Sequence, residues 1–226
     1  MTILAIILGL IPSFAWLLFY LREDLKHPEP KRLIFFVFIL GGIATFLAFY
    51  LELYASDILF NAGIKNYTPI SLTVFSFIEE SLKFLLVFIF ISRSKYFNEP
   101  VDAMIYMVTV ALGFAAVENI AITVNEWNDL QNISTVFETI TLRFIGATLL
   151  HTLSSGVIGY YWAKGKQYHE KIFFIPIAII LGTFIHAIFN FLILNSLNII
   201  IPTMFLGLVG LFVLHDFDNL KRYIRF

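Results

Sequence analysis

Seven apolar runs of membrane-spanning length divide this 226-residue sequence and leave little chain for anything else. A helix needs about 20 mainly apolar residues to cross the hydrocarbon of a bilayer. The pattern predicts an all-α fold, a polytopic membrane bundle of about seven transmembrane helices, as one domain over residues 1–226. The predicted spans cover residues 3–21, 33–54, 70–91, 101–124, 136–163, 172–194 and 199–214.

Composition supports this class and excludes several others. Hydrophobic residues make up 59% of the chain and the mean hydropathy is +0.86, values too high for a soluble domain of this size. The apolar composition makes the lipid bilayer the expected surrounding. A net charge of -1 gives no basis for nucleic-acid binding. The absence of cysteine excludes disulfides, thiolate zinc sites and cysteine nucleophiles.

The distribution of basic residues predicts how the chain is oriented. Arg22, Lys26, Lys31 and Arg32 follow the first run directly, which therefore reads as a retained span with the N-terminus outside. Alternation then assigns 12 basic residues to inner loops and the inner tail, and only Lys65 to outer loops. The expected topology is N-terminus out and C-terminus in.

Two adjacent glutamates, Glu79 and Glu80, lie in the middle of the third run. A buried acidic side chain costs roughly 2.5 to 3.5 kcal/mol on insertion scales, so two together imply a polar interior. Glu79 and Lys83 are four residues apart and share a helix face, whereas Glu80 points about 100° away. One glutamate can be held structurally while the other stays free for chemistry, and spacing does not decide which.

Further polar residues occur within the fourth, fifth and sixth runs. Single residues of this kind also serve as packing or interfacial groups, but their convergence with the glutamate pair favours a site. His186 and Asn190 are one helical turn apart, so the amide can orient the ring or donate to an oxyanion. These candidates are Glu118, Asn119, Arg143, His151, His186 and Asn190.

Depth along the spans is a constraint on this site. Counting about 1.5 Å per residue places Glu79 and Glu80 near mid-membrane, Glu118 and His186 closer to the outer end, and His151 deeper. The groups can share one cavity only if the spans tilt or if the fifth span starts late, near Gly146.

Several protease motifs are missing. His169-Glu170 is not followed by the second histidine of a His-Glu-x-x-His motif, and Leu153 stands where a Gly-x-Ser-Gly motif needs its first glycine. There is also no intramembrane aspartate pair. Serine, aspartyl and zincin-type mechanisms are therefore disfavoured.

The polar segments together resemble the PrsW family of intramembrane proteases, which are distant relatives of the type II CAAX prenyl endopeptidases. The resemblance runs nearly the full chain and rests on Glu29-Pro30, the segments 77–83, 102–106 and 113–119, His151, and the pair His186 and Asn190. PrsW-like proteins often carry aspartate where this chain has Asn190. CAAX enzymes place histidine where it has Glu118, which favours PrsW.

The resemblance implies an endopeptidase of a prokaryotic plasma membrane that cuts membrane-anchored proteins, typified by site-1 cleavage of anti-sigma factors. Glu80 or Glu79 is the expected general base, with His151 and His186 polarising the carbonyl or protonating the leaving amine. Asn190 would stabilise the oxyanion, and Lys83 and Asn119 would give structural support.

A metal-dependent version uses the same groups. His151, His186 and a carboxylate, here Glu118, would hold Zn²⁺ and leave a fourth position for water. Two other classes stay open: an ion or proton transporter, because intramembrane acids and histidines also mark ion paths, and a non-enzymatic membrane scaffold. Inverted repeats and broken helices typical of transporters are not evident in the sequence.

Overall fold

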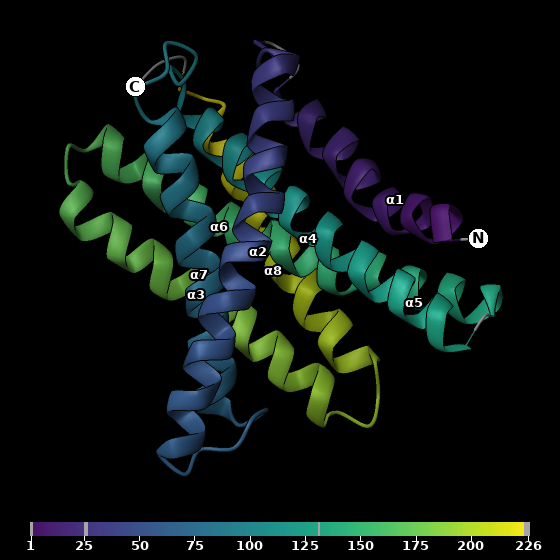
Figure 1. Cartoon of the computed structure of the whole chain (residues 1–226). Coiled ribbons are helices and arrows are strands. Elements are labelled where there is room, and N and C mark those ends of the chain that lie inside the picture. The colour runs from purple at the N-terminus through teal and green to yellow at the C-terminus, as the bar shows by residue number, and fades with distance from the viewer. Residues whose placement is uncertain (1, 25–26, 131, 224–226) are drawn as a thin grey trace.

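The computed structural model describes residues 2–24, 27–130 and 132–223, and within them the chain is all-α (Figure 1). Six helical segments are long and apolar enough to cross a membrane. The all-α polytopic prediction is therefore confirmed. The elements are α1 (Thr2–Tyr20), the short 3₁₀ helix η1 (Leu21–Asp24), α2 (Lys31–Asn61), α3 (Pro69–Ile91), α4 (Pro100–Leu130), α5 (Ile133–Ile145), α6 (Ala147–Gln167), α7 (Lys171–Asn195) and α8 (Ile200–Leu220).

The third predicted span differs from the other six in charge. α3 has 23 residues and is long enough to cross, but it carries Glu79, Glu80 and Lys83 near its middle. Thr68 caps its start by accepting a hydrogen bond from the Ser71 amide, and Pro69 occupies the first turn. α3 runs antiparallel to α2 in Figure 1 and returns the chain through the bundle.

The fifth predicted span is not one continuous helix. The backbone breaks at Gly146, where φ is -96° and ψ is -95°, and separates α5 from α6. α5 has 13 residues, which reach only about 20 Å and cannot cross the hydrocarbon alone. The predicted span over 136–163 is therefore built from two helices, and the second starts late, after Gly146, as the depth constraint allowed.

α4 is the central helix, and two-thirds of its most apolar stretch is buried. α1, α2 and α6 pack around it, while α7 packs on both α6 and α3. The closest crossing joins Gly41 of α2 to Gly113 of α4: a Cβ at Gly113 would lie 1.9 Å from the carbonyl oxygen of Phe38. Small residues thus bring α2 against the part of α4 that carries Glu118.

The loops predicted to be cytoplasmic lie together at one end of the bundle, here called the inner end. His27 forms an ion pair with Glu99 at 2.8 Å, and Lys166 donates to the carbonyl oxygen of Phe97 at 3.0 Å. Lys221 pairs with Glu23. These contacts join loops that the alternation of spans places on the same side of the membrane. The orientation with the N-terminus outside stays a prediction. Lys26 and Arg225, used in the orientation argument, lie outside the described residues.

Candidate active site

Five helices bring the candidate residues of the sequence to one region inside the bundle. α3 supplies Glu79, Glu80 and Lys83; α4 supplies Glu118 and Asn119; α5 supplies Arg143; α6 supplies His151; and α7 supplies His186. The late start of α6 after Gly146 brings His151 to the depth of the glutamates, which answers the depth constraint raised by the sequence.

Glu80 is completely buried and fully engaged. Its Oε1 accepts hydrogen bonds from Lys83 Nζ at 2.9 Å and from the Ser154 hydroxyl at 2.9 Å. Its Oε2 accepts from the Ser155 hydroxyl at 2.8 Å. His186 Nδ1 lies 2.9 Å from Oε1 and is the donor, because an ionised carboxylate can only accept. Four donors on one carboxylate make Glu80 an anchor between α3, α6 and α7.

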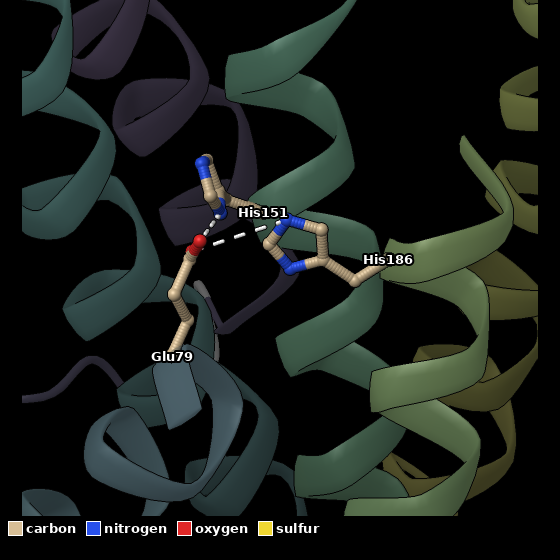
Figure 2. Close-up of side chains that lie close together, drawn as sticks. All are labelled: Glu79, His151 and His186. Carbon is tan, nitrogen blue, oxygen red and sulfur yellow. Dashed lines mark ion pairs between the residues drawn. The ribbon is translucent and has the colours of Figure 1, made fainter. Parts of the chain in front are cut away.

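Glu79 is the opposite case. It is also buried, but its Oε2 has no hydrogen-bond partner among the described residues. This oxygen lies 3.5 Å from Lys83 Nζ, 3.7 Å from His151 Nδ1 and 3.9 Å from His186 Nε2. Figure 2 shows the carboxylate pointing at both imidazoles. The geometry separates the two glutamates that spacing alone left equivalent.

Each histidine is held by a carboxylate on one nitrogen and faces Glu79 with the other. Glu80 accepts from Nδ1 of His186, which leaves the Nε2 lone pair toward Glu79. His151 Nε2 lies 2.9 Å from Glu118 Oε2 and donates to it, which leaves the Nδ1 lone pair toward Glu79 and Lys83. The two carboxylates thus fix both tautomers, as carboxylates do for histidines that bind metals.

Glu118 and Asn119 are joined to α5 and α6 by a further network. Arg143 donates to Glu118 Oε2 at 3.1 Å and to Asn119 Oδ1 at 2.5 Å. The Asn119 amide donates to the Thr148 hydroxyl at 3.0 Å. Glu118 therefore positions His151, and Asn119 positions Arg143 and the first turn of α6.

Glu79, His151 and His186 can converge on one cation. Each offers one ligand atom, and the three atoms lie within 4.8 Å of one another. The sequence analysis named Glu118 as the carboxylate ligand, whereas the structure places Glu79 there. Glu118 Oε2 instead contacts Arg143 and His151. With a metal bound, Lys83 would have to give up its 2.9 Å contact with His151 Nδ1 and keep Glu80.

Charge in the site also fits a divalent cation. The ionisable side chains that interact there include the carboxylates of Glu52, Glu79, Glu80 and Glu118 and the cations of Lys83 and Arg143. With neutral imidazoles and all four carboxylates ionised, as binding of a cation would require of its ligands, four carboxylates against two cations would leave an excess of two negative charges. A Glu/His/His set that leaves a fourth position open is typical of catalytic zinc.

Two residues differ most from the sequence-based interpretation. Glu52 of α2 was not singled out, yet it interacts electrostatically with Glu79, Glu118 and Lys83, and its Oε1 is buried without a partner among the described residues. An acid in an otherwise apolar membrane run was the available signal. Asn190 is half-buried and lines a neighbouring pocket with Arg143.

Fold and site together define a class, that of polytopic membrane proteins with a buried glutamate and histidine centre suited to hydrolysis. Comparison with known proteins identifies the family. Residues 29–215 match the model of the PrsW family of intramembrane metalloproteases, and the chain belongs to this family. It is a multi-pass membrane peptidase of the prokaryotic plasma membrane.

Three relatives named Protease PrsW illustrate the match. The protein of Oceanobacillus iheyensis (strain DSM 14371 / CIP 107618 / JCM 11309 / KCTC 3954 / HTE831) is 29% identical over 222 residues, covering 95% of this chain and 93% of its own length. The Geobacillus kaustophilus (strain HTA426) protein is 26% identical over 189 residues, covering 82% and 78%. The Bacillus subtilis (strain 168) protein is 25% identical over 186 residues, covering 81% and 80%. No solved structure matches significantly.

Proposed function

We propose that this chain hydrolyses a peptide bond of a membrane-anchored protein, with Glu79 as the group that acts on the attacking water. The observation that carries the assignment is the unpartnered Oε2 of Glu79 between two imidazoles of fixed tautomer. A carboxylate oxygen with no other donor is available to hold a water and take its proton. Glu80, which the sequence offered as an equal candidate, has both oxygens engaged.

The other residues hold this arrangement and stabilise charge. Lys83 Nζ lies 3.5 Å from Glu79 Oε2 and 2.9 Å from Glu80 Oε1, so it joins the two neighbouring carboxylates. His186 Nε2 carries a free lone pair in its fixed tautomer, so it can take a proton from Glu79 and pass it to the leaving amine. His151 Nδ1 accepts from Lys83 Nζ at 2.9 Å and can take this part only when that contact is released. Asn190 is the amide proposed to stabilise the oxyanion.

The metal part of the proposal concerns zinc. Glu79, His151 Nδ1 and His186 Nε2 would hold the ion, which when bound would polarise the scissile carbonyl and a water molecule. Glu79 is then engaged as a ligand. The buried Oε1 of Glu52 is the carboxylate oxygen that remains to accept a proton from water. Site-1 cleavage of anti-sigma-factor-type substrates remains part of the proposal through the family resemblance.

The test is cleavage of tagged single-span reporters in liposomes, with the metal content of the same preparations measured by mass spectrometry. We expect wild type to cleave, and Glu79→Gln and His186→Ala to be inactive and depleted of zinc. His215→Ala, in an exposed position on α8, is the matched histidine control and should behave as wild type. A folded wild type without cleavage of any reporter would refute the proposed activity, and active enzyme free of metal would refute the zinc.

A further inference from the structure

Two large pockets lie on either side of α5. The first, between α2, α4 and α5, has a volume of about 510 Å³ and is lined by apolar side chains together with Glu52, Glu118 and Arg143. The second, between α5, α7 and α8, has about 480 Å³ and is lined by apolar side chains together with Arg143 and Asn190. They are called the α2/α5 pocket and the α5/α8 pocket below. Arg143 lines both.

His151 and His186 line neither pocket, but each pocket is lined by residues that neighbour one or both of them. In the α2/α5 pocket, the Phe114 ring lies 5.3 Å from the His151 ring, and Glu118 contacts His151 Nε2 at 2.9 Å. In the α5/α8 pocket, Asn190 comes one helical turn after His186, and Ala147 comes one turn before His151. From these neighbours we infer that the centre formed by Glu79, His151 and His186 lies between the two pockets.

The lining of both pockets suits a stretched polypeptide from a membrane protein. Both volumes lie in the range of ligand sites, about 300 to 1,000 Å³. Apolar walls can take the side chains of a transmembrane or juxtamembrane segment. An unwound backbone inside a membrane needs hydrogen-bond partners for every N–H and C=O. Glu52 Oε1, buried and without a partner among the described residues, offers an acceptor in one pocket, and the Asn190 amide offers a donor in the other.

We propose that the two pockets are the two halves of one substrate groove and that α5 is a movable wall between them. The inference rests on the proposed function, because the occupant is an extended segment of the membrane-anchored substrate with its scissile bond at Glu79. For that segment to run from one pocket into the other, Arg143 must release its contacts with Glu118 and Asn119.

The attachment of α5 is suited to such a movement. The backbone break at Gly146 uncouples it from α6, so α5 can shift without displacing His151. At its C-terminal end, Trp16 Nε1 of α1 donates to the carbonyl oxygen of Phe144 at 2.9 Å, and the Trp16 and Phe144 rings stack at 5.4 Å. A crosslink between positions 16 and 144 would therefore hold α5 against α1.

A crosslink at this contact tests whether α5 moves. The chain has no cysteine, so Trp16→Cys with Phe144→Cys introduces the only two thiols. They are joined by a bifunctional methanethiosulfonate reagent, which reductant removes. We expect the crosslink to slow reporter cleavage on the order of tenfold or more, and reductant to restore the rate, because closure of the wall blocks the groove.

The control is a crosslink that leaves α5 free. Ser56→Cys with Asn66→Cys uses a 3.0 Å side-chain contact between α2 and the loop that follows it. The same reagent should leave cleavage by this variant unchanged. Full activity of the Trp16/Phe144 variant at complete crosslinking would overturn the proposal.

A binding experiment tests the groove without relying on turnover. Benzoylphenylalanine replaces Phe49 in the α2/α5 pocket or Ile193 in the α5/α8 pocket, in a Glu79→Gln background, and the reporter is photocrosslinked. We expect adducts from both positions and none from Leu211, an exposed residue of α8. Adducts from one pocket only would overturn the proposal that both pockets belong to one substrate groove. Adducts from both positions with no cleavage by wild type would refute the protease proposal while leaving the groove standing.

Discussion

Among the described residues, acidic side chains gather in one cluster at the centre of the bundle and another at its inner end, and the two differ in how many hydrogen bonds the acids accept. At the inner end, Asp102 Oδ2 accepts from the amides of Asn98 at 2.9 Å and Glu99 at 2.7 Å, and Glu29 accepts from the Tyr106 hydroxyl. In the centre, Glu80 is saturated while Glu79 Oε2 and Glu52 Oε1 have no partner among the described residues.

This difference separates residues that hold the fold from residues that do chemistry. A buried polar atom without a partner costs roughly 1 to 3 kcal/mol, so a fold gains nothing from keeping one. Apart from Glu52, the central acids Glu79, Glu80 and Glu118 and the inner-end acids Glu29 and Asp102 belong to segments through which the sequence resembles PrsW proteins. The inner-end segments 29–30 and 102–106 lie together, where they join the first loop to the start of α4. We assign them a structural role.

The largest expected effect is on the rate, at Glu79. Glu79→Gln keeps the shape of the side chain but removes the carboxylate that is the base without a metal and a ligand with zinc, and we expect reporter cleavage to fall by about 10²- to 10⁴-fold. Thermal unfolding in detergent should change little, because Oε2 makes no hydrogen bond and Lys83, which lies 3.5 Å from it, keeps its closer contact with Glu80 at 2.9 Å. Substantial cleavage by this variant would move the chemistry to another group.

At Glu80 the expected effect is mainly on stability. Glu80→Ala removes the closest carboxylate from the buried Lys83, and breaking a buried pair from one side costs about 3 to 5 kcal/mol. We expect a marked drop in the unfolding temperature, and loss of activity as a consequence. An unfolding temperature equal to that of wild type would show that Glu80 is not the anchor that its four donors indicate.

Glu118 should have a smaller effect, because it acts through His151. Glu118→Gln removes the charge that holds the imidazole tautomer, and comparable partners of metal-binding histidines contribute about 10- to 100-fold. The expected signature is a lower kcat with an unchanged KM. A raised KM with unchanged kcat would instead mean that Glu118 contacts the substrate.

The smallest effect is expected at the inner end. Asp102→Ala removes two hydrogen bonds to backbone amides and should cost about 1 to 3 kcal/mol of unfolding free energy. Cleavage per folded molecule should not change. A loss of kcat without a loss of stability would contradict the contrast between the clusters and place the inner end in the reaction.

The sequence by itself determined the class of fold and most members of the site. Apolar runs of about 20 residues must be helices in lipid, because each backbone group needs an internal hydrogen bond there. Glutamates and histidines within such runs are costly enough that Glu79, Glu80, Glu118, His151 and His186 stood out against the apolar background. The resemblance to PrsW proteins rested on the same residues, and the family match confirms it.

Only the tertiary structure decided how these residues divide the work. Sequence spacing fixes which residues share a helix face, but not what the facing helix presents. Ser154, Ser155 and His186 saturate Glu80 rather than Glu79 because α6 and α7 approach from its side. The break at Gly146 set the depth of His151, and the close α2–α4 crossing brought Glu52 to the site. These contacts join segments that are far apart in the sequence, so the spacing of residues within one segment cannot predict them.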